Sequence, residues 1–196
     1  MTVNSEFTDV TVRLWRLARQ TGDQLRNCMD ELLRKYNITT ERYEVLVSIK
    51  YLGEYVNITD VASWLRRSTN SVSMIIDRMV KAGLVRRVRN KRDRRLVRLI
   101  ITEKGENIIQ RASPACWEII NEILSPLSYE DRQTFVNLFE IVDYKVLECL
   151  NPGKDIEEMV RKRTEKRAKF MKQVPPYARI SIPEVKRQNG KKRKTM

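Results

Sequence analysis

The chain has 196 residues, of which 41% are hydrophobic and 33% are charged, which suffices for a core with many exposed helical faces. Its formal net charge of +14 favours nucleic acid or an anionic membrane as a partner. The sequence contains no histidine and no glycine-rich phosphate loop, so we expect no enzyme, no cofactor and no metal site. No apolar run approaches the roughly 20 residues of a membrane span, and no signal peptide is evident. We therefore expect a cytoplasmic protein.

The N-terminal part is predicted to form two helices, the first over residues 4–36. Its apolar side chains recur at steps of three and four residues, from Phe7 through Leu14 and Leu17 to Leu32. Such a stripe is close to the heptad seam of a coiled coil and needs a partner helix. The second helix is predicted from a cap at Thr39 to about residue 52.

The stretch 57–105 is predicted to form two helices joined by a tight turn and followed by a hairpin. Thr59 is predicted to cap the first helix, residues 60–65, and residues 66–69 make the turn. In the second helix, one apolar face at helical spacing comprises Val72, Ile75, Ile76 and Met79. The opposite face carries short or polar side chains, namely Asn70, Ser73, Met74 and Asp77. A helix with one buried apolar face and one face of short or polar side chains suits insertion into a groove of DNA.

Gly83 is predicted to adopt the left-handed conformation that ends this helix. Residues 84–88 and 96–101 are rich in β-branched residues and predict the two strands of a hairpin. The tip of the hairpin carries Arg92, Asp93, Arg94 and Arg95. A helix–turn–helix followed by a basic hairpin is a winged helix.

After the hairpin, helices are predicted over residues 103–125 and 128–150. The second has an apolar face that includes Phe135, Phe139 and Val142. A single winged helix cannot bury the apolar helices that both ends of the chain present. The predicted fold is therefore mainly α, with a winged helix-turn-helix DNA-binding lobe and a helical dimerisation lobe from both chain ends.

A strong break at residues 151–153 separates a basic tail. Residues 151–196 hold 15 basic and 5 acidic residues, whereas residues 1–150 hold 24 and 20. Residues 155–174 predict a basic amphipathic helix, and residues 186–194 are expected to be disordered. The predicted division is an N-terminal dimerisation helix (1–37), a DNA-binding domain (38–105), C-terminal dimerisation helices (106–150) and a basic tail (151–196).

The run from about residue 38 to 105 resembles the multiple-antibiotic-resistance (MarR) family of transcriptional regulators. The matching residues are Ala62, Leu65, Val72-Ser73, Asp77-Arg78, Gly83-Leu84-Val85, Arg92-Asp93-Arg94-Arg95, Leu99 and Thr102-Glu103-Lys104-Gly105. The resemblance implies an obligate homodimer that binds a pseudo-palindromic DNA operator. The family often has arginine at position 74 and an apolar residue at position 67. Met74 and Arg67 stand there in this chain, which predicts a more basic and less buried turn.

The resemblance implies the roles of Arg95 and Asp93, and the chemistry of the other side chains indicates the remaining contacts with DNA. Arg95, oriented by Asp93, is expected in the minor groove, and Arg92 and Arg94 are expected at phosphates. On the second helix, Asn70 suits adenine and Met74 suits a thymine methyl group. Ser71 and Ser73 are expected at phosphates or base edges. The predicted DNA-binding set is completed by Arg66, Arg67, Thr69 and Arg78.

A small aromatic or anionic effector is implied by the family, and Trp15, Arg16 and Tyr43 are the candidate lining of its pocket. Ordinary packing at an interface is the competing interpretation of these three residues. The favoured function is a dimeric DNA-binding repressor. One alternative is an architectural protein that binds DNA without sequence preference through its basic tail. Another is a regulator whose basic amphipathic segment binds anionic lipid.

Overall fold

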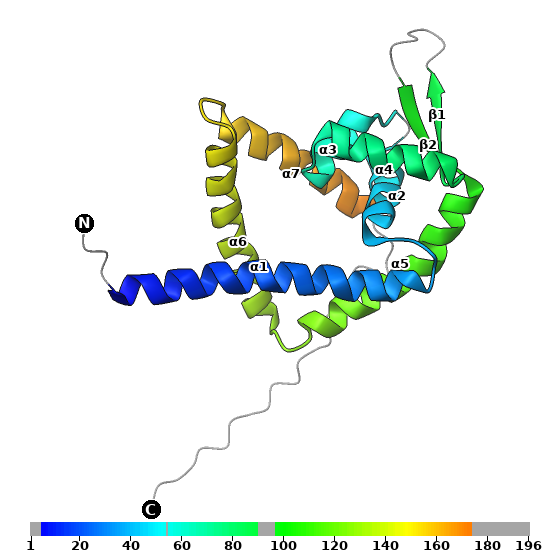
Figure 1. Cartoon of the computed structure of the whole chain (residues 1–196). Helices are drawn as coiled ribbons and strands as arrows, with labels where there is room; N and C mark the ends of the chain where they lie inside the picture. The colour runs from blue at the N-terminus through cyan, green and yellow to red at the C-terminus, as the bar shows by residue number, and fades with distance from the viewer. Residues whose placement is uncertain (1–4, 54, 90–96, 174–196) are drawn as a thin grey trace, which may run out of the picture.

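The computed structural model describes residues 5–53, 55–89 and 97–173 (Figure 1). This part of the chain is mainly helical with one two-stranded antiparallel sheet, so the predicted fold class is confirmed. In chain order the elements are α1 Ser5–Arg34, α2 Thr40–Leu52, α3 Ile58–Leu65, α4 Thr69–Lys81, β1 Val85–Arg89, β2 Val97–Ile101, α5 Glu103–Leu124, α6 Tyr129–Leu150 and α7 Ile156–Gln173. None of the helices in these ranges is both long and apolar enough to cross a membrane.

Side-chain caps set the start of both helices in the helix–turn–helix. Asn57 caps α3, because its side chain accepts the N–H of Asp60 at 3.0 Å and the Asp60 carboxylate accepts the N–H of Asn57 at 3.2 Å. The predicted cap at Thr59 is therefore wrong, and this reciprocal capping box starts the helix earlier. Ser68 caps α4 with its side-chain oxygen. Between the helices, Arg66 adopts a left-handed conformation with φ 54° and ψ 40°, which is uncommon for a residue other than glycine.

One core joins the C-terminal end of α1 to α2, α3, α4, the sheet and α5. Its largest fully buried side chains include Leu33, Leu46, Ile76, Met79 and Leu99. At the start of α5 the backbone approaches the sheet so closely that only glycine fits: a Cβ at position 105 would meet the carbonyl oxygen of residue 84 at 2.5 Å. The winged lobe thus shares one core with the end of α1 and with α5.

The hairpin follows α4 as the sequence predicted. Gly83 has φ +70°, the left-handed conformation that ends the helix. Strands β1 and β2 pair with Val85 opposite Ile101 and Arg89 opposite Val97. The tip of this hairpin, including Arg92, Asp93, Arg94 and Arg95, lies outside the described residues.

Helices α1 and α6 extend beyond the core (Figure 1). From residue 9 to residue 27 every side chain of α1 is exposed, and only the last turns of this helix pack on the lobe. Large apolar side chains on these two helices face outward, with Leu14 64%, Val10 70%, Ile141 68% and Phe139 52% exposed. Both helices therefore present apolar faces that the chain does not cover by itself.

Helix α7 turns back from α6 and packs against both α6 and α2 (Figure 1). Leu147 near the end of α6 is 4% exposed and Ile156 at the start of α7 is 8% exposed, and both lie outside the main core. The predicted helix over residues 155–174 is thus confirmed. The end of the basic tail, including residues 186–194, lies outside the described residues.

Candidate nucleic-acid interface

Helix α4 has two faces of opposite character. Val72, Ile75, Ile76 and Met79 are buried against the core, as predicted. The outer face exposes Thr69, Asn70, Ser71, Met74 and Arg78. Met74 is 58% exposed, so its apolar thioether side chain is accessible among the polar side chains of this face. This arrangement leaves the outer face available to a partner.

An arginine of the hairpin holds the sheet against α4. Arg87 in β1 donates to the Asp77 carboxylate at 2.5 Å and to the Ser73 hydroxyl at 3.4 Å. Ser73 is half-buried and accepts this bond from Arg87, and its contact with DNA remains a prediction. Sequence reasoning did not single out Arg87. The alternation of side chains along β1 could have indicated it, because residues 87 and 88 point to opposite faces of the strand.

Basic residues line the described stem of the hairpin. Arg86 and Arg89 are exposed on β1, and Arg98 is half-buried on β2, where it lies opposite Val88. Side chains alternate along the strands, so Arg86 and Arg98 lie on the face opposite to Arg87 and the described stem carries basic side chains on both faces. Charge of this kind is what attracts a phosphate backbone.

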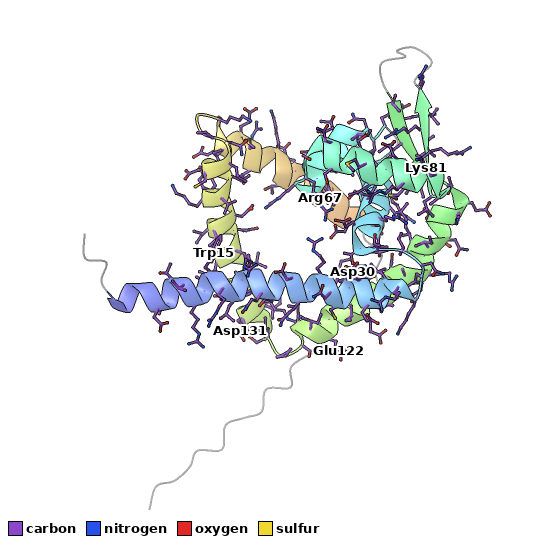
Figure 2. The ribbon with its side chains drawn as sticks, in the orientation of Figure 1. Trp15, Asp30, Arg67, Lys81, Glu122 and Asp131 are labelled. Carbon is purple, nitrogen blue, oxygen red and sulfur yellow. The ribbon has the colours of Figure 1, made fainter. Side chains whose placement is uncertain are left out.

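The two arginines of the turn are engaged in ion pairs within the chain. Arg67 donates to Glu41 at 2.9 Å and to Glu44 at 3.4 Å, and only 19% of its side chain is exposed (Figure 2). Arg67 is thus largely buried, because two carboxylates of α2 compensate its charge, whereas residues 66, 68 and 69 of the turn are exposed. Burial raises the pKa of the Glu44 carboxyl, and the Arg67 charge opposes that shift.

Arg66 donates to Asp143 of α6 through both terminal guanidinium nitrogens, Nη1 and Nη2, and Nη2 lies 2.8 Å from Oδ2. The partner carboxylate lies 77 residues away in the chain. The Arg66 side chain therefore contacts α6, although 54% of it remains exposed.

The three candidate effector-pocket residues are not brought together within this chain. Tyr43 is buried, and its hydroxyl lies 2.8 Å from the hydroxyl of Ser113 in α5. Burial raises the pKa of Tyr43. Trp15 is 72% exposed and lies on the half of α1 that does not reach the core (Figure 2). It precedes Asp30, where α1 meets α2, by 15 residues, or about 22 Å of helix.

A cavity of about 550 Å³ lies instead at the junction of α1 and α2. Its lining includes Arg26, Arg34 and Arg42 with Asp30 and Glu41. The Asp30 carboxylate accepts the N–H of Thr40 at 2.9 Å, and this hydrogen bond lowers the pKa of Asp30. Among the described residues, no cluster of histidine, cysteine, aspartate and glutamate has the geometry of a metal site.

A helix–turn–helix followed by a two-stranded antiparallel wing defines a winged helix. Residues 38–97 match the model of the MarR family. YsmB of Bacillus subtilis, described as an uncharacterized HTH-type transcriptional regulator, is 30% identical over 105 residues, which are 54% of this chain and 71% of YsmB. The HTH-type transcriptional repressor IacR of Pseudomonas putida is 26% identical over 139 residues, which are 71% of this chain and 82% of IacR. The chain belongs to the MarR family of HTH-type transcriptional regulators.

Solved structures share the same fold. A mutant of Escherichia coli MarR complexed with operator DNA superposes with a TM-score of 0.62 at 22% identity. The match covers 68% of this chain and 96% of that one. YsmB and IacR are both transcriptional regulators, a class of protein distinct from enzymes.

Proposed function

We propose that this regulator is a homodimeric repressor that inserts α4 into the major groove of a pseudo-palindromic DNA operator. The outer face of α4 carries the proposal, because Asn70, Ser71 and Met74 are exposed on a helix whose other face is fixed in the core. A rigid helix with short exposed side chains meets the steric requirement for reading base edges. The MarR mutant in complex with operator DNA and the repressor IacR support this assignment.

The dimer follows from the exposed faces of α1 and α6. Leu14 and Leu17 are 64% and 48% exposed, and Phe139 and Val142 are 52% and 55% exposed. Monomeric soluble proteins rarely leave contiguous apolar surface of this kind uncovered. Residues 1–37 and 106–150 would then form the dimerisation lobe, and residues 38–105 the DNA-binding domain.

The proposed base contacts keep the assignments made from the sequence. Asn70 pairs with adenine, Met74 packs on a thymine methyl group, and Arg78 meets the backbone. Arg95, oriented by Asp93, enters the minor groove, while Arg92 and Arg94 meet phosphates. Arg67 is better explained as a structural ion-pair partner of α2 than as a contact to DNA, because both of its carboxylate partners are in place.

An effector that releases DNA is part of the proposal, and an anionic one is favoured. The cavity between α1 and α2 offers Arg26, Arg34 and Arg42 against the carboxylates Asp30 and Glu41. Trp15 and Arg16 would contribute to a pocket only where a second chain completes it.

The test compares an inverted repeat from the DNA upstream of the gene with a random duplex of equal length at one salt concentration. We expect the repeat to bind at least about 10³-fold more tightly. Asn70→Ala should weaken binding to the inverted repeat by about 1–3 kcal/mol, the scale of one bidentate base contact, and should leave binding to the random duplex unchanged. Asn107→Ala, on the exposed surface of α5, is the matched control and should change neither affinity. Equal affinity for both duplexes would refute a sequence-specific repressor.

A second function is favoured by the tail, whose 15 basic and 5 acidic residues suit an architectural DNA-binding protein. Deleting residues 176–196 leaves α7 intact, since that helix ends at Gln173. If the tail binds DNA as an arm, this deletion should weaken specific and random binding by similar factors. It should also flatten the salt dependence by several units, because each released phosphate contact contributes about 0.9 to the slope. An unchanged slope would exclude the tail from DNA binding.

A further inference from the structure

The winged lobe is tied to α6 by an ion pair and by α7. In the ion pair, the Arg66 guanidinium meets both carboxylate oxygens of Asp143, and Nη2 lies 2.8 Å from Oδ2. Helix α7 packs against α2 of the lobe and also against α6. Asp143 and α7 both lie beyond residues 38–97, which match the family model.

The ion pair acts at the base of the candidate recognition helix. Arg66 is the C-cap of α3, and its N–H is bonded to the carbonyl oxygens of Ala62 and Ser63. Only Arg67 and the cap Ser68 separate it from the first residue of α4. A bidentate arginine–carboxylate pair fixes orientation as well as distance, because both groups are planar. The position of Asp143 on α6 thus constrains the start of α4.

The second tie has its anchor at the corner between α6 and α7. Leu147 and Ile156 are 4% and 8% exposed at this corner. Beyond the corner, an open pocket of about 680 Å³ lies beside the ion pair, lined by Arg66 and by residues of α6 and α7 that include Tyr144, Val160 and Thr164. The lobe is therefore held against α6 and α7 by a few specific contacts, in addition to the main core that joins it to α1 and α5.

We propose that Asp143 and α7 position the winged lobe on the dimerisation helices and thereby set the operator spacing that the dimer accepts. The inference rests on the proposed function as a DNA-binding dimer. Because α6 belongs to the proposed dimerisation lobe, a lobe fixed relative to α6 is also fixed relative to the twofold axis. Recognition helices of such dimers meet half-sites about 34–36 Å apart. A fixed lobe accepts one spacing, whereas a lobe free to tilt accepts several.

The experiment measures the affinity of the full-length protein for inverted repeats whose central spacer is shortened or lengthened in single base-pair steps. Asp143→Asn removes the charge that holds Arg66, and Ile156→Asp detaches the start of α7. Glu148→Gln is the matched control, because it makes the same charge change on α6 and breaks only the exposed pair with Lys145. The quantity compared is the ratio of the affinity at the best spacing to that two base pairs away.

We expect this ratio to fall about two- to fivefold in Asp143→Asn, the range for a partly exposed ion pair. Ile156→Asp should lower the ratio as well, and Glu148→Gln should leave it at the wild-type value. An unchanged ratio in both Asp143→Asn and Ile156→Asp would overturn this inference alone. So would tighter binding by Asp143→Asn at every spacing with the ratio preserved, since Asp143 would then only withhold Arg66 from phosphate. A wild-type protein that does not prefer the inverted repeat would overturn the proposed function together with the inference.

Discussion

The winged lobe buries its apolar side chains, whereas helices α1 and α6, which we call the arms, leave many of theirs exposed. In the lobe, Val72, Ile76 and Met79 of a single helix are each 0% exposed. On the arms, Val10, Leu150 and Ile141 are 70%, 72% and 68% exposed. Both regions have apolar residues at helical spacing, so the spacing alone does not distinguish them.

The difference lies in the number of elements that surround each helix. Helix α4 contacts α2, α3 and β1, which together cover its apolar face. From residue 9 to residue 27 every side chain of α1 is exposed, so the apolar stripe of this part of the helix has no cover within the described chain. The apolar side chains of the lobe are thus covered within one chain, whereas those of the arms are not.

The largest expected effect breaks the arms and spares the lobe. Replacing Leu14 and Leu17 with aspartate places two charges in the apolar stripe of α1, which should abolish the dimer. Light scattering should then give the mass of one chain or show insoluble protein, whereas the wild type gives the mass of two. Val12→Asp is the control, because Val12 is also exposed, at 56%, but lies on the opposite side of the helix. A wild-type mass equal to one chain would contradict the assignment of the arms.

The next effect separates the two faces of α4, which carry one methionine each. Met79→Ala should lower the free energy of unfolding by about 2–5 kcal/mol, because Met79 is 0% exposed and leaves a cavity. Met74→Ala should change it by less than about 0.5 kcal/mol, since Met74 is 58% exposed. Urea denaturation measures both values. Equal losses for the two variants would mean that the faces are assigned wrongly.

Patterns within one element were predictable from the sequence, and contacts between distant elements were not. The buried face of α4 and the left-handed Gly83 depend on neighbouring residues, and both are confirmed. The cap of α3 was placed wrongly, because Asn57 and Thr59 are both good capping residues and only the geometry chooses between them.

The contacts of the turn needed the tertiary structure. Arg67 meets carboxylates that lie 26 and 23 residues away, and no local pattern connects them. Trp15 and Tyr43 were expected to line one pocket, but Trp15 is exposed far along α1 and Tyr43 is buried against α5, so the structure separates them within this chain. The DNA contacts themselves remain predictions.

A smaller effect tests whether the wing reads DNA in the minor groove. Arg95→Ala should weaken operator binding by about 1–3 kcal/mol, the scale of a good groove contact. Replacing A·T pairs under the wing with G·C should remove most of that difference, because a narrow A·T tract concentrates the negative potential that attracts arginine. Fluorescence anisotropy with both operators and both proteins measures the coupling. If Arg95→Ala binds the A·T operator as tightly as the wild type does, the wing has no such role.

The smallest expected effect concerns the link between α4 and the wing stem. Arg87 donates to Asp77 at 2.5 Å, but 33% and 51% of these two side chains are exposed, so solvent screens much of their attraction. A double-mutant cycle with Asp77→Asn and Arg87→Gln should give a coupling of about 0.2–1 kcal/mol in the free energy of unfolding.

Because salt screens exposed charges over about 10 Å at 0.1 M, the coupling should shrink when the urea titrations are repeated at high salt. A coupling that persists undiminished at high salt would show that the hydrogen-bond geometry, and the second contact to Ser73 at 3.4 Å, contributes more than the charges. A coupling of zero at low salt would show that Arg87 does not hold the wing against α4, and the orientation of the sheet would then depend on buried residues such as Val85 and Leu99.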